Sequence, residues 1–313
     1  MISAVGEGET ANDELYFCVD GGGTRSRGRL FDREGRVLAD AEDGACNPAT
    51  DFQLALASVS GLWRQCCAAI ARPNDDFAGV AFSAGSAGTY LEVGAKFLAA
   101  LPAFSRTCLM SDGYAALIGA GFGAPSSLII IGTGVAGHRL FANGLSIQRD
   151  AWGWLAGDRG SGSWIGQKAV RHCFAALDGV VARDGLSEAV LKEIGGAQAI
   201  RAGAMRDLGP RRFASFAPLV IEQADAGDAM AMRIRDRAVE HLAATIGVIA
   251  SPEAPLYAAG GLVAPLRPWL SSRLASPILD PQGDALIGCF LVATGRAPAE
   301  RALLFGETVE PSP

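Results

Sequence analysis

The sequence predicts an α/β protein made of two duplicated lobes, each with a mixed sheet, and a cleft between the lobes. Strand patterns come first and then alternate with helix patterns, as they do in mixed-sheet α/β folds. Two glycine-rich loops each follow an apolar strand and each lead into a hairpin. The hairpin residues Phe31 and Phe141 lie 110 residues apart (141 minus 31), which indicates duplication of a half-chain.

Hydrophobic periodicity places the elements along the chain. We expect strands at 15–20, 27–32, 37–40, 77–83, 107–111, 127–132, 138–142, 145–149 and 256–259. We expect helices at 52–71, 91–101, 113–121, 162–177, 187–194, 214–226, 229–249 and 284–294. The tetrapeptide Ala-Leu-Ile-Gly occurs at 116–119 and again at 285–288. Both copies fall on expected helices with small residues on one side, so we expect two helices that cross closely between the lobes and serve as a hinge.

The duplication also predicts the domain boundaries. The first lobe is expected at 15–116 together with a C-terminal segment, 288–313, that returns to it, and the second lobe at 117–287. Residues 1–14 are acidic and lack the apolar core of a secretory signal. We therefore expect this segment to be a disordered leader.

Composition excludes several classes of protein. The chain has 313 residues, of which 50% are apolar and 19% charged, as in ordinary globular proteins with a large core. A net charge of −6 gives no electrostatic basis for binding nucleic acid, and no apolar run reaches the length of about 18 residues that a membrane span needs. The seven cysteines lack metal-ligand spacing. We expect reduced core thiols in a cytoplasmic protein.

The first glycine loop reads Asp20, Gly21, Gly22, Gly23 and Thr24. Consecutive glycines let the backbone approach an anion and turn several N–H groups toward it. The strand-end carboxylate of Asp20 is placed to hold Mg²⁺ through water, and Thr24 adds a hydroxyl donor. A plain Asp-Gly hairpin turn is the alternative, but three glycines followed by threonine favour a phosphate loop.

The second loop, Gly132, Thr133 and Gly134, begins a match to G-x-G-x-x-G, and Asp150 follows downstream. A nicotinamide-binding domain is therefore an alternative, but it needs a helix directly after the glycines. The residues after this loop have the pattern of a hairpin around an Asn-Gly turn. Without the helix this alternative is disfavoured, and a second phosphate loop is predicted.

Asp112 ends an apolar strand and begins a helix rich in small residues. The alternative is that it only caps this helix. Its strand ends between the two loops in sequence, where α/β sheets place their ligand crevice. A carboxylate there can accept a proton from a substrate hydroxyl, so we predict a catalytic base.

A polar glycine-rich segment at 157–166 follows Trp152 and contains Asp158 and Ser161. A carboxylate beside an aromatic ring suits a sugar, whose hydroxyls need acceptors and whose C–H faces pack on rings. The alternative is that Asp158 or Ser161 caps the following helix. Both roles are compatible if Asp158 faces the ligand and Ser161 makes the cap.

Three more segments follow expected strands. Asn47 and Ser83 can each hydrogen-bond a hydroxylated ligand, and each can equally belong to loop structure. Gly260 and Gly261 form a glycine turn into a helix. Such a turn permits close contact with a flat base, although a plain strand-to-helix turn explains it almost as well.

The ordered series Asp-Gly-Gly-Gly-Thr, a strand-end Asp, Gly-Thr-Gly, Gly-Asp-x-Gly-Ser and a late Gly-Gly resembles the BadF/BadG-type ATPase family. The resemblance extends over residues 15–296. It implies the actin/hexokinase/Hsp70 fold with two ribonuclease H-like lobes. It also implies ATP and Mg²⁺ as cofactors, with 20–24 and 132–134 as the phosphate loops and 260–261 as the adenosine turn.

Sugar-kinase members of this family include N-acetylglucosamine kinase. Similarity to them implies that Asn47, Ser83, Asp112, Trp152 and Asp158 form the sugar site, with Asp112 as the base. The reaction implied is ATP-dependent phosphorylation of the 6-hydroxyl of N-acetyl-D-glucosamine. An amino sugar is then the small-molecule partner, and we also expect a homodimer.

One residue departs from the family pattern, because members usually have glutamate where this chain has Arg159. This departure leaves Asp158 intact but bears on how the loop is held. Glucosamine kinase remains an alternative that differs by one acetyl group. An ATPase activator with an iron–sulfur cluster is a second alternative, disfavoured because the cysteines follow apolar patterns. The zinc-binding glucokinases are disfavoured because clustered cysteines are missing.

Overall fold

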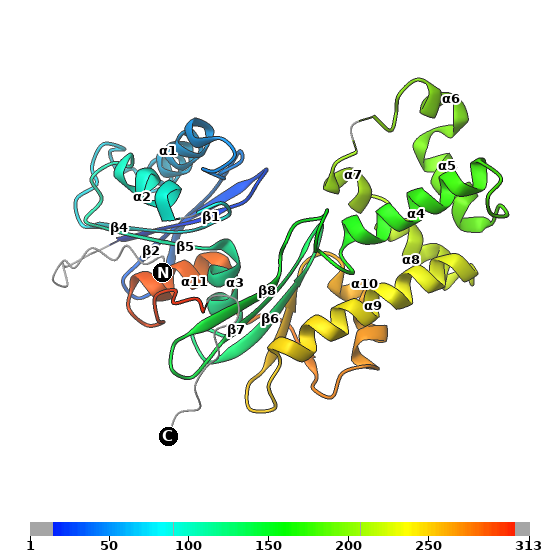
Figure 1. The fold of residues 1–313 in the computed structure, drawn as a ribbon. Helices are drawn as coiled ribbons and strands as arrows, with labels where there is room; N and C mark the ends of the chain where they lie inside the picture. The colour runs from blue at the N-terminus through cyan, green and yellow to red at the C-terminus, as the bar shows by residue number, and fades with distance from the viewer. Residues whose placement is uncertain (1–14, 90, 207, 304–313) are drawn as a thin grey trace. The chain divides into compact units, whose positions relative to one another are not determined.

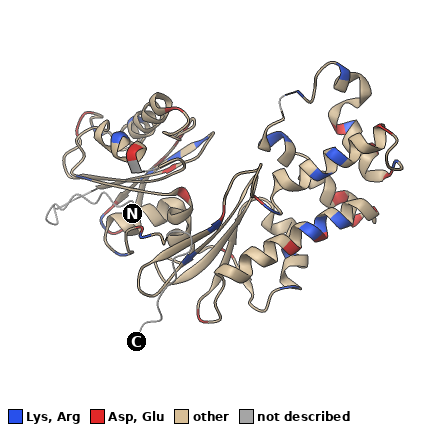
Figure 2. Cartoon of the chain, in the orientation of Figure 1, with Lys and Arg blue, Asp and Glu red and all other residues tan. Residues whose placement is uncertain are grey.

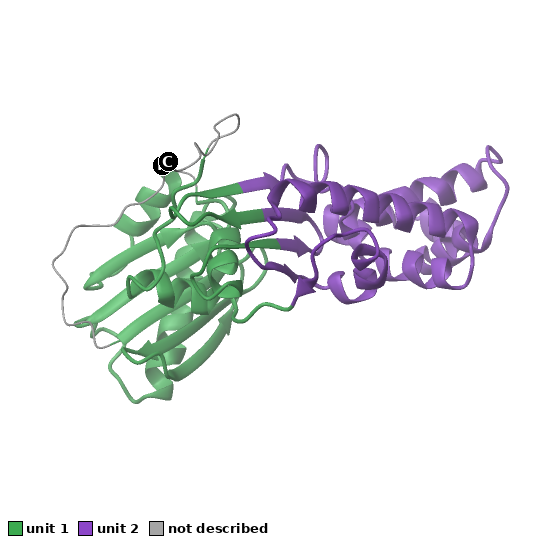
Figure 3. Ribbon diagram, turned by 90° about the horizontal axis from the view of Figure 1, so that it is seen from below, with its two compact units in different colours: residues 1–128, 138–147, 280–313 green, residues 129–137, 148–279 purple. Residues whose placement is uncertain are grey.

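The computed structural model describes residues 15–89, 91–206 and 208–303, and the expected leader at 1–14 lies outside them. The chain forms two compact units (Figures 1 and 3). Unit 1 comprises residues 1–128, 138–147 and 280–313, and unit 2 comprises 129–137 and 148–279. The lobe boundaries expected near residues 116 and 288 stay a prediction.

Unit 1 contains a five-stranded sheet of order β3-β2-β1-β4-β5. Its strands are β1 (Leu15–Gly21), β2 (Ser26–Asp32), β3 (Val37–Asp43), β4 (Val80–Ser86) and β5 (Arg106–Met110). The β1–β2 and β2–β3 pairs are antiparallel, whereas β4 runs parallel to both β1 and β5. The carboxyl ends of β1, β4 and β5 therefore meet at one edge of the sheet.

The second sheet has the order β10-β9-β6-β7-β8. Its strands are β6 (Ser126–Ile131), β7 (Val135–Leu140), β8 (Ser146–Asp150), β9 (Leu256–Ala259) and β10 (Ile278–Leu279). Read in reverse, this order repeats that of the first sheet, with β6 in the place of β1 and β9 in the place of β4. The two glycine loops occupy the same position, between the first and second strands of each repeat. The predicted duplication is confirmed.

Helices cover both faces of the unit 1 sheet (Figure 1). They are α1 (Phe52–Ala69) and α2 (Leu91–Ala99) on one face, and α3 (Asp112–Ala120) and α11 (Ala285–Ala293) on the other. Alternation along β1 explains this arrangement, since successive side chains of a strand point to opposite faces. Phe17 packs with Trp63 of α1, whereas Tyr16 packs with Phe290 of α11. The last helix thus returns to the first half of the chain, as predicted.

The helices of unit 2 surround a separate core that includes β6 and β9. They are α4 (Gly162–Leu177), α5 (Gly185–Ile194), α6 (Gly196–Arg201), α7 (Pro210–Ala214), α8 (Ala217–Asp225), α9 (Ala229–Ile249) and α10 (Val263–Ser271). Figure 2 shows basic and acidic residues interspersed along α9, including the pairs Arg235–Asp236 and Arg237–Glu240. None of the helices in the described part of the chain is both long and apolar enough to cross a membrane.

Helices α3 and α11 carry the repeated tetrapeptide and cross closely within unit 1. A Cβ added to Gly119 would overlap the carbonyl of Asp284, and a Cβ added to Gly288 would overlap the carbonyl of Ala115. Glycine at both positions therefore permits contact between the two helix backbones. The expected close crossing is confirmed, but it lies within unit 1 and not between two lobes, and the hinge role stays a prediction.

Candidate functional site

Two predicted site carboxylates stand at the same edge of the unit 1 sheet. Strand register aligns Asp20 of β1 with Gly85 of β4, and Gly85 with Met110 of β5. Asp112 follows two residues after Met110. A Cβ added to Gly85 would overlap the Cβ of Ala115 in the first turn of α3, and would lie 3.6 Å from the Cα of Asp112. The absence of a side chain at Gly85 thus lets the start of α3 settle between the strand ends, near Asp20.

The first glycine loop is anchored at its base and open at its tip. Gly22 N–H donates to Arg25 O at 3.1 Å, and Gly22 O accepts from Cys46 N–H at 2.9 Å. Gly23 is exposed, and an added Cβ would meet nothing within 4 Å. Its N–H donates to no residue of the described chain. This geometry leaves a backbone donor facing open space, as a phosphate loop requires.

Asp20 pairs with a cation that the motif search did not identify. Arg27 lies opposite Asp20 in the hairpin, and its Nε and Nη2 donate to Asp20 Oδ2 at 3.3 and 2.8 Å. Arg27 Nη1 also lies 3.4 Å from Asp284 Oδ2, and Asp284 caps α11. In the described part of the chain no three His, Cys, Asp or Glu side chains gather to hold a metal. The role of Asp20 in holding Mg²⁺ stays a prediction.

Asp112 is not the helix cap that the alternative reading required. Ser111 caps α3, because its Oγ accepts from Tyr114 N–H at 3.2 Å. Asp112 Oδ1 accepts only from the adjacent Gly113 N–H, at 2.9 Å, within the described chain. The carboxylate is exposed by surface area, yet protein atoms surround much of it. This partial burial, together with the charge of Asp20, raises the pKa of Asp112 above its ordinary value.

Glu300 fixes the residue that precedes Asp112. Its Oε2 accepts from Ser111 N–H and its Oε1 from Ser111 Oγ, both at 2.7 Å. Burial and the nearby charge of Asp112 raise the pKa of Glu300. A residue from the end of the described chain thus determines how α3 begins, and with it the position of Asp112.

The two remaining candidates of unit 1 have structural partners. Asn47 Oδ1 accepts from the N–H groups of Ala49 and Thr50 at 3.1 and 3.2 Å, which forms a local turn. The Ser83 hydroxyl is fully buried and donates to Cys289 O at 2.9 Å. This bond ties α11 to β4. Sugar contacts by Asn47 and Ser83 stay predictions.

In unit 2, the second glycine loop leads directly into β7 and not into a helix. The nicotinamide-binding alternative therefore lacks its essential element. The loop carbonyls face α4, since Gly132 O accepts from Gly162 N–H at 2.8 Å and Thr133 O from Ser163 N–H at 3.1 Å. The N–H groups of Thr133 and Gly134 donate to no residue of the described chain. They are the backbone donors that this loop offers to an anion.

The late glycine turn packs beside this loop. Gly260 has φ +104° and its added Cβ would overlap the carbonyl of Ile131, the residue before Gly132. Leu262 N–H donates to the same carbonyl at 3.1 Å. Nothing lies within 4 Å of an added Cβ at Gly261. The turn runs from β9 into α10 as predicted, and its second residue leaves room for a flat ligand.

Asp158 contacts the second glycine loop as well. A Cβ added to Gly134 would lie 2.9 Å from its carboxylate, and its Oδ1 accepts from Val135 N–H at 3.1 Å. Burial raises the pKa of Asp158, and the charge of Asp150 adds to this effect. Ser161 makes the cap of α4, with its Oγ accepting from Trp164 N–H at 3.1 Å. Ser161 therefore makes the helix cap, as predicted. The role of Asp158 toward a sugar stays a prediction.

Trp152 presents an exposed aromatic ring near this segment, with 56% of its surface accessible. Trp154, two residues later, packs instead against Phe213 at 5.8 Å between ring centroids. The loop thus separates an outward ring from a core ring, and only the outward one suits stacking on a sugar face.

The cysteines behave as core residues. All seven are free, and six of them are buried. Burial raises the pKa of Cys46 to about 11 and that of Cys66 to about 12. These thiols are protonated at neutral pH, as the sequence predicted, and none has the low pKa of a reactive cysteine.

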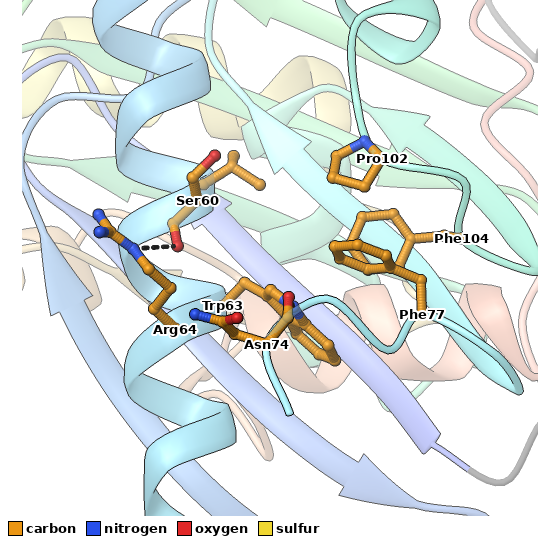
Figure 4. Close-up of a pocket in the computed structure, with 8 residues that line it drawn as sticks. Ser60, Trp63, Arg64, Asn74, Phe77, Pro102 and Phe104 are labelled. Carbon is orange, nitrogen blue, oxygen red and sulfur yellow. Dashed lines mark hydrogen bonds between the residues drawn. The ribbon is translucent and has the colours of Figure 1, made fainter. Parts of the chain in front are cut away.

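A separate cavity of about 220 Å³ lies in unit 1 (Figure 4). Its walls include the rings of Trp63, Phe77 and Phe104, which contact one another with centroids 5.0–5.6 Å apart. Phe77 and Phe104 precede β4 and β5 in the chain. The cavity therefore lies at the amino ends of these strands, opposite the edge that carries Asp20 and Asp112, and does not belong to that site.

A known protein family has a sequence model that matches most of this chain. The family model described as the BadF/BadG/BcrA/BcrD ATPase family matches residues 18–267, which is more than half of the chain. The chain belongs to this family. Membership accounts for the duplicated sheets and for the position of a glycine loop between the first two strands of each. It bears out the family resemblance that the motifs indicated.

Three known proteins show how similar the chain is to individual relatives. It is 26% identical over 281 residues to a glucosamine kinase of Vibrio cholerae, covering 89% of this chain and 95% of that protein. A crystal structure of a candidate N-acetylglucosamine kinase from Chromobacterium violaceum has a TM-score of 0.79 at 32% identity, covering 90% of this chain and 100% of that one. A candidate N-acetylglucosamine kinase from Porphyromonas gingivalis has a TM-score of 0.64 at 20% identity, covering 90% and 98%. The last comparison shows likeness of fold alone.

Proposed function

We propose that this protein is an ATP-dependent amino-sugar kinase that phosphorylates the 6-hydroxyl of N-acetyl-D-glucosamine, with glucosamine as the alternative substrate. The observation that carries the proposal is the placement of Asp112. It is an exposed carboxylate beside an open glycine loop, and Ser111 rather than Asp112 caps the helix. The names of the relatives from Vibrio cholerae and Chromobacterium violaceum support a sugar as acceptor.

The proposed roles follow from the groups that each unit offers. Unit 1 would supply Asp112 as the base that takes the proton from the sugar hydroxyl, and the Gly23 amide as a phosphate donor. Unit 2 would supply the amides of Thr133 and Gly134 for phosphate and the carboxylate of Asp158 for sugar hydroxyls. In such a reaction positioning and charge neutralisation dominate over covalent chemistry.

ATP with Mg²⁺ would supply the phosphoryl group and neutralise its charge. Asp20 fits the ion through water, with Arg27 holding one of its two carboxylate oxygens. The adenine base would lie against the Gly260-Gly261 turn, where an added Cβ at Gly261 would meet nothing within 4 Å. The homodimer and the cytoplasmic location expected from the sequence stay predictions.

One assay separates the candidate functions. ADP release is measured with N-acetylglucosamine, glucosamine, glucose or no sugar present. The proposal requires ADP release that depends on one of the amino sugars, and the higher kcat/KM decides between them. Equal ADP release with and without sugar would instead favour an ATPase activator.

A further inference from the structure

Arg159, the residue at which the motif departs from the pattern it resembles, contacts a buried acid. Asp150 ends β8, and its side chain is completely buried. Its Oδ2 has no hydrogen-bond partner in the described chain. Arg159 Nε lies 3.5 Å from that oxygen and is the cation that pairs with it, while the Arg159 side chain is 55% exposed.

Asp150 also holds the backbone of Asp158, the residue proposed to bind the sugar. Asp150 Oδ1 accepts from Asp158 N–H at 2.8 Å. Asp150 and Asp158 both have left-handed backbones, with φ of +60° and +51°. Non-glycine residues adopt this conformation infrequently, and hydrogen bonds from neighbouring groups stabilise it where it occurs. The bond between Asp150 and Asp158 is such a hydrogen bond.

Electrostatics explains why this arrangement needs a cation. Two carboxylates lie close together in buried surroundings, and a buried charge is costly unless it is paired. Without a partner, the buried charge of Asp150 would be uncompensated, which would weaken its hold on Asp158. The guanidinium of Arg159 reaches Asp150 from the solvent side and supplies the missing charge.

We propose that Arg159 is a positioning residue that neutralises Asp150 and thereby holds Asp158 in its sugar-binding conformation. This inference rests on the proposed function. Because Asp158 would bind the sugar equally before and during phosphoryl transfer, loss of Arg159 should raise the KM for sugar and leave kcat nearly unchanged.

A double-mutant cycle tests the inference. Arg159→Gln should raise the sugar KM about tenfold, the effect of weakening one charge-assisted hydrogen bond, with kcat and the KM for ATP within about twofold. Arg159→Lys, which keeps the charge, should recover most of the affinity. Asp150→Asn keeps the acceptor oxygen but removes the charge, so adding Arg159→Gln to it should change KM less than about twofold. Arg171→Gln, an exposed arginine of α4, is the matched control and should behave as wild type.

Two results would overturn the inference: a wild-type sugar KM in Arg159→Gln, or an equal rise in KM with and without Asp150→Asn. Thermal unfolding of the four proteins of the cycle (wild type, Arg159→Gln, Asp150→Asn and the double variant) gives a readout that needs no substrate. Arg159→Gln should lower Tm by about 3 °C in the wild-type background and leave it unchanged beside Asp150→Asn. If wild type uses no sugar, the proposed function fails, and the Tm cycle alone decides whether Arg159 compensates Asp150.

Discussion

The burial of His138 against the first turn of α3 gives a quantitative prediction about stability. This residue of β7 is 4% exposed, and its Nε2 has no hydrogen-bond partner in the described chain. A Cβ added to Gly113, in the first turn of α3, would overlap the His138 ring. Burial lowers the pKa of His138 from 6.5 to about 4. The positive end of the α3 dipole also disfavours a charge there.

The sign of the effect follows from linkage. As pH falls below 6.5, the histidine of the unfolded chain takes up a proton, whereas the folded chain does so only near pH 4. Acid therefore favours the unfolded state. At about 1.4 kcal/mol for each tenfold change, the full loss is about 3 kcal/mol, of which about 2 kcal/mol is already lost at pH 5.

Urea unfolding between pH 7.5 and pH 5 measures this loss. His138→Gln keeps a polar side chain but cannot be protonated, so wild type should lose about 2 kcal/mol more than this variant over the range. His241 is only partly buried, so His241→Gln should keep most of the wild-type pH dependence. Parallel pH dependences for wild type and His138→Gln would refute the reasoning.

Three further predictions test other parts of the structure. Gly288→Ala should destabilise the protein by about 1–3 kcal/mol, because the new methyl would overlap Ala115 O. The control Gly247→Ala has open space in α9 and should stabilise the protein by up to about 1 kcal/mol. Equal urea midpoints for the two variants would contradict the close crossing of α3 and α11. Asp20→Ala should lower turnover and raise the Mg²⁺ concentration for half-maximal rate, and an unchanged Mg²⁺ titration would remove Asp20 from the metal site. Asp158→Ala should raise the sugar KM about tenfold or more. An unchanged KM would show that Asp158 does not bind the sugar and only accepts the hydrogen bond from Val135 N–H.

Much of the fold could be predicted because its signals are local. Glycine runs after apolar strands reveal the loops, and the alternating pattern after Gly134 distinguishes a hairpin from a helix. The order of the two sheets then confirms the duplication that Phe31 and Phe141 indicated. Three elements escaped prediction, namely α6, α7 and β10, and α10 was expected only as a helix after the Gly260-Gly261 turn, without bounds. The first two are short and α10 contains Pro268, while β10 has two residues, too few for any period.

The sequence could indicate candidate ligand-facing residues, whose roles stay predictions, but not the residues that support them. The hairpin register held a usable signal for Arg27, since Asp20 and Arg27 are direct cross-strand neighbours. No local pattern could identify Glu300, which lies 189 residues from Ser111 in the chain. For Asp112 the sequence favoured a base over a helix cap, and in the structure Ser111 makes the cap.

The most direct test of the account is phosphoryl transfer by Asp112→Asn. General-base catalysis contributes roughly 10²–10⁴ in rate, so sugar-dependent turnover should fall by at least about a hundredfold. The Kd of this variant for ATP, measured by calorimetry, should stay within about twofold of wild type. Its remaining activity should no longer fall at low pH, because the acid limb of the pH–rate profile is assigned to Asp112. Because burial raises the pKa of Asp112, the wild-type limb should lie above the ordinary range of an aspartate, with activity lost as pH falls. Turnover close to wild type in Asp112→Asn would contradict the central claim.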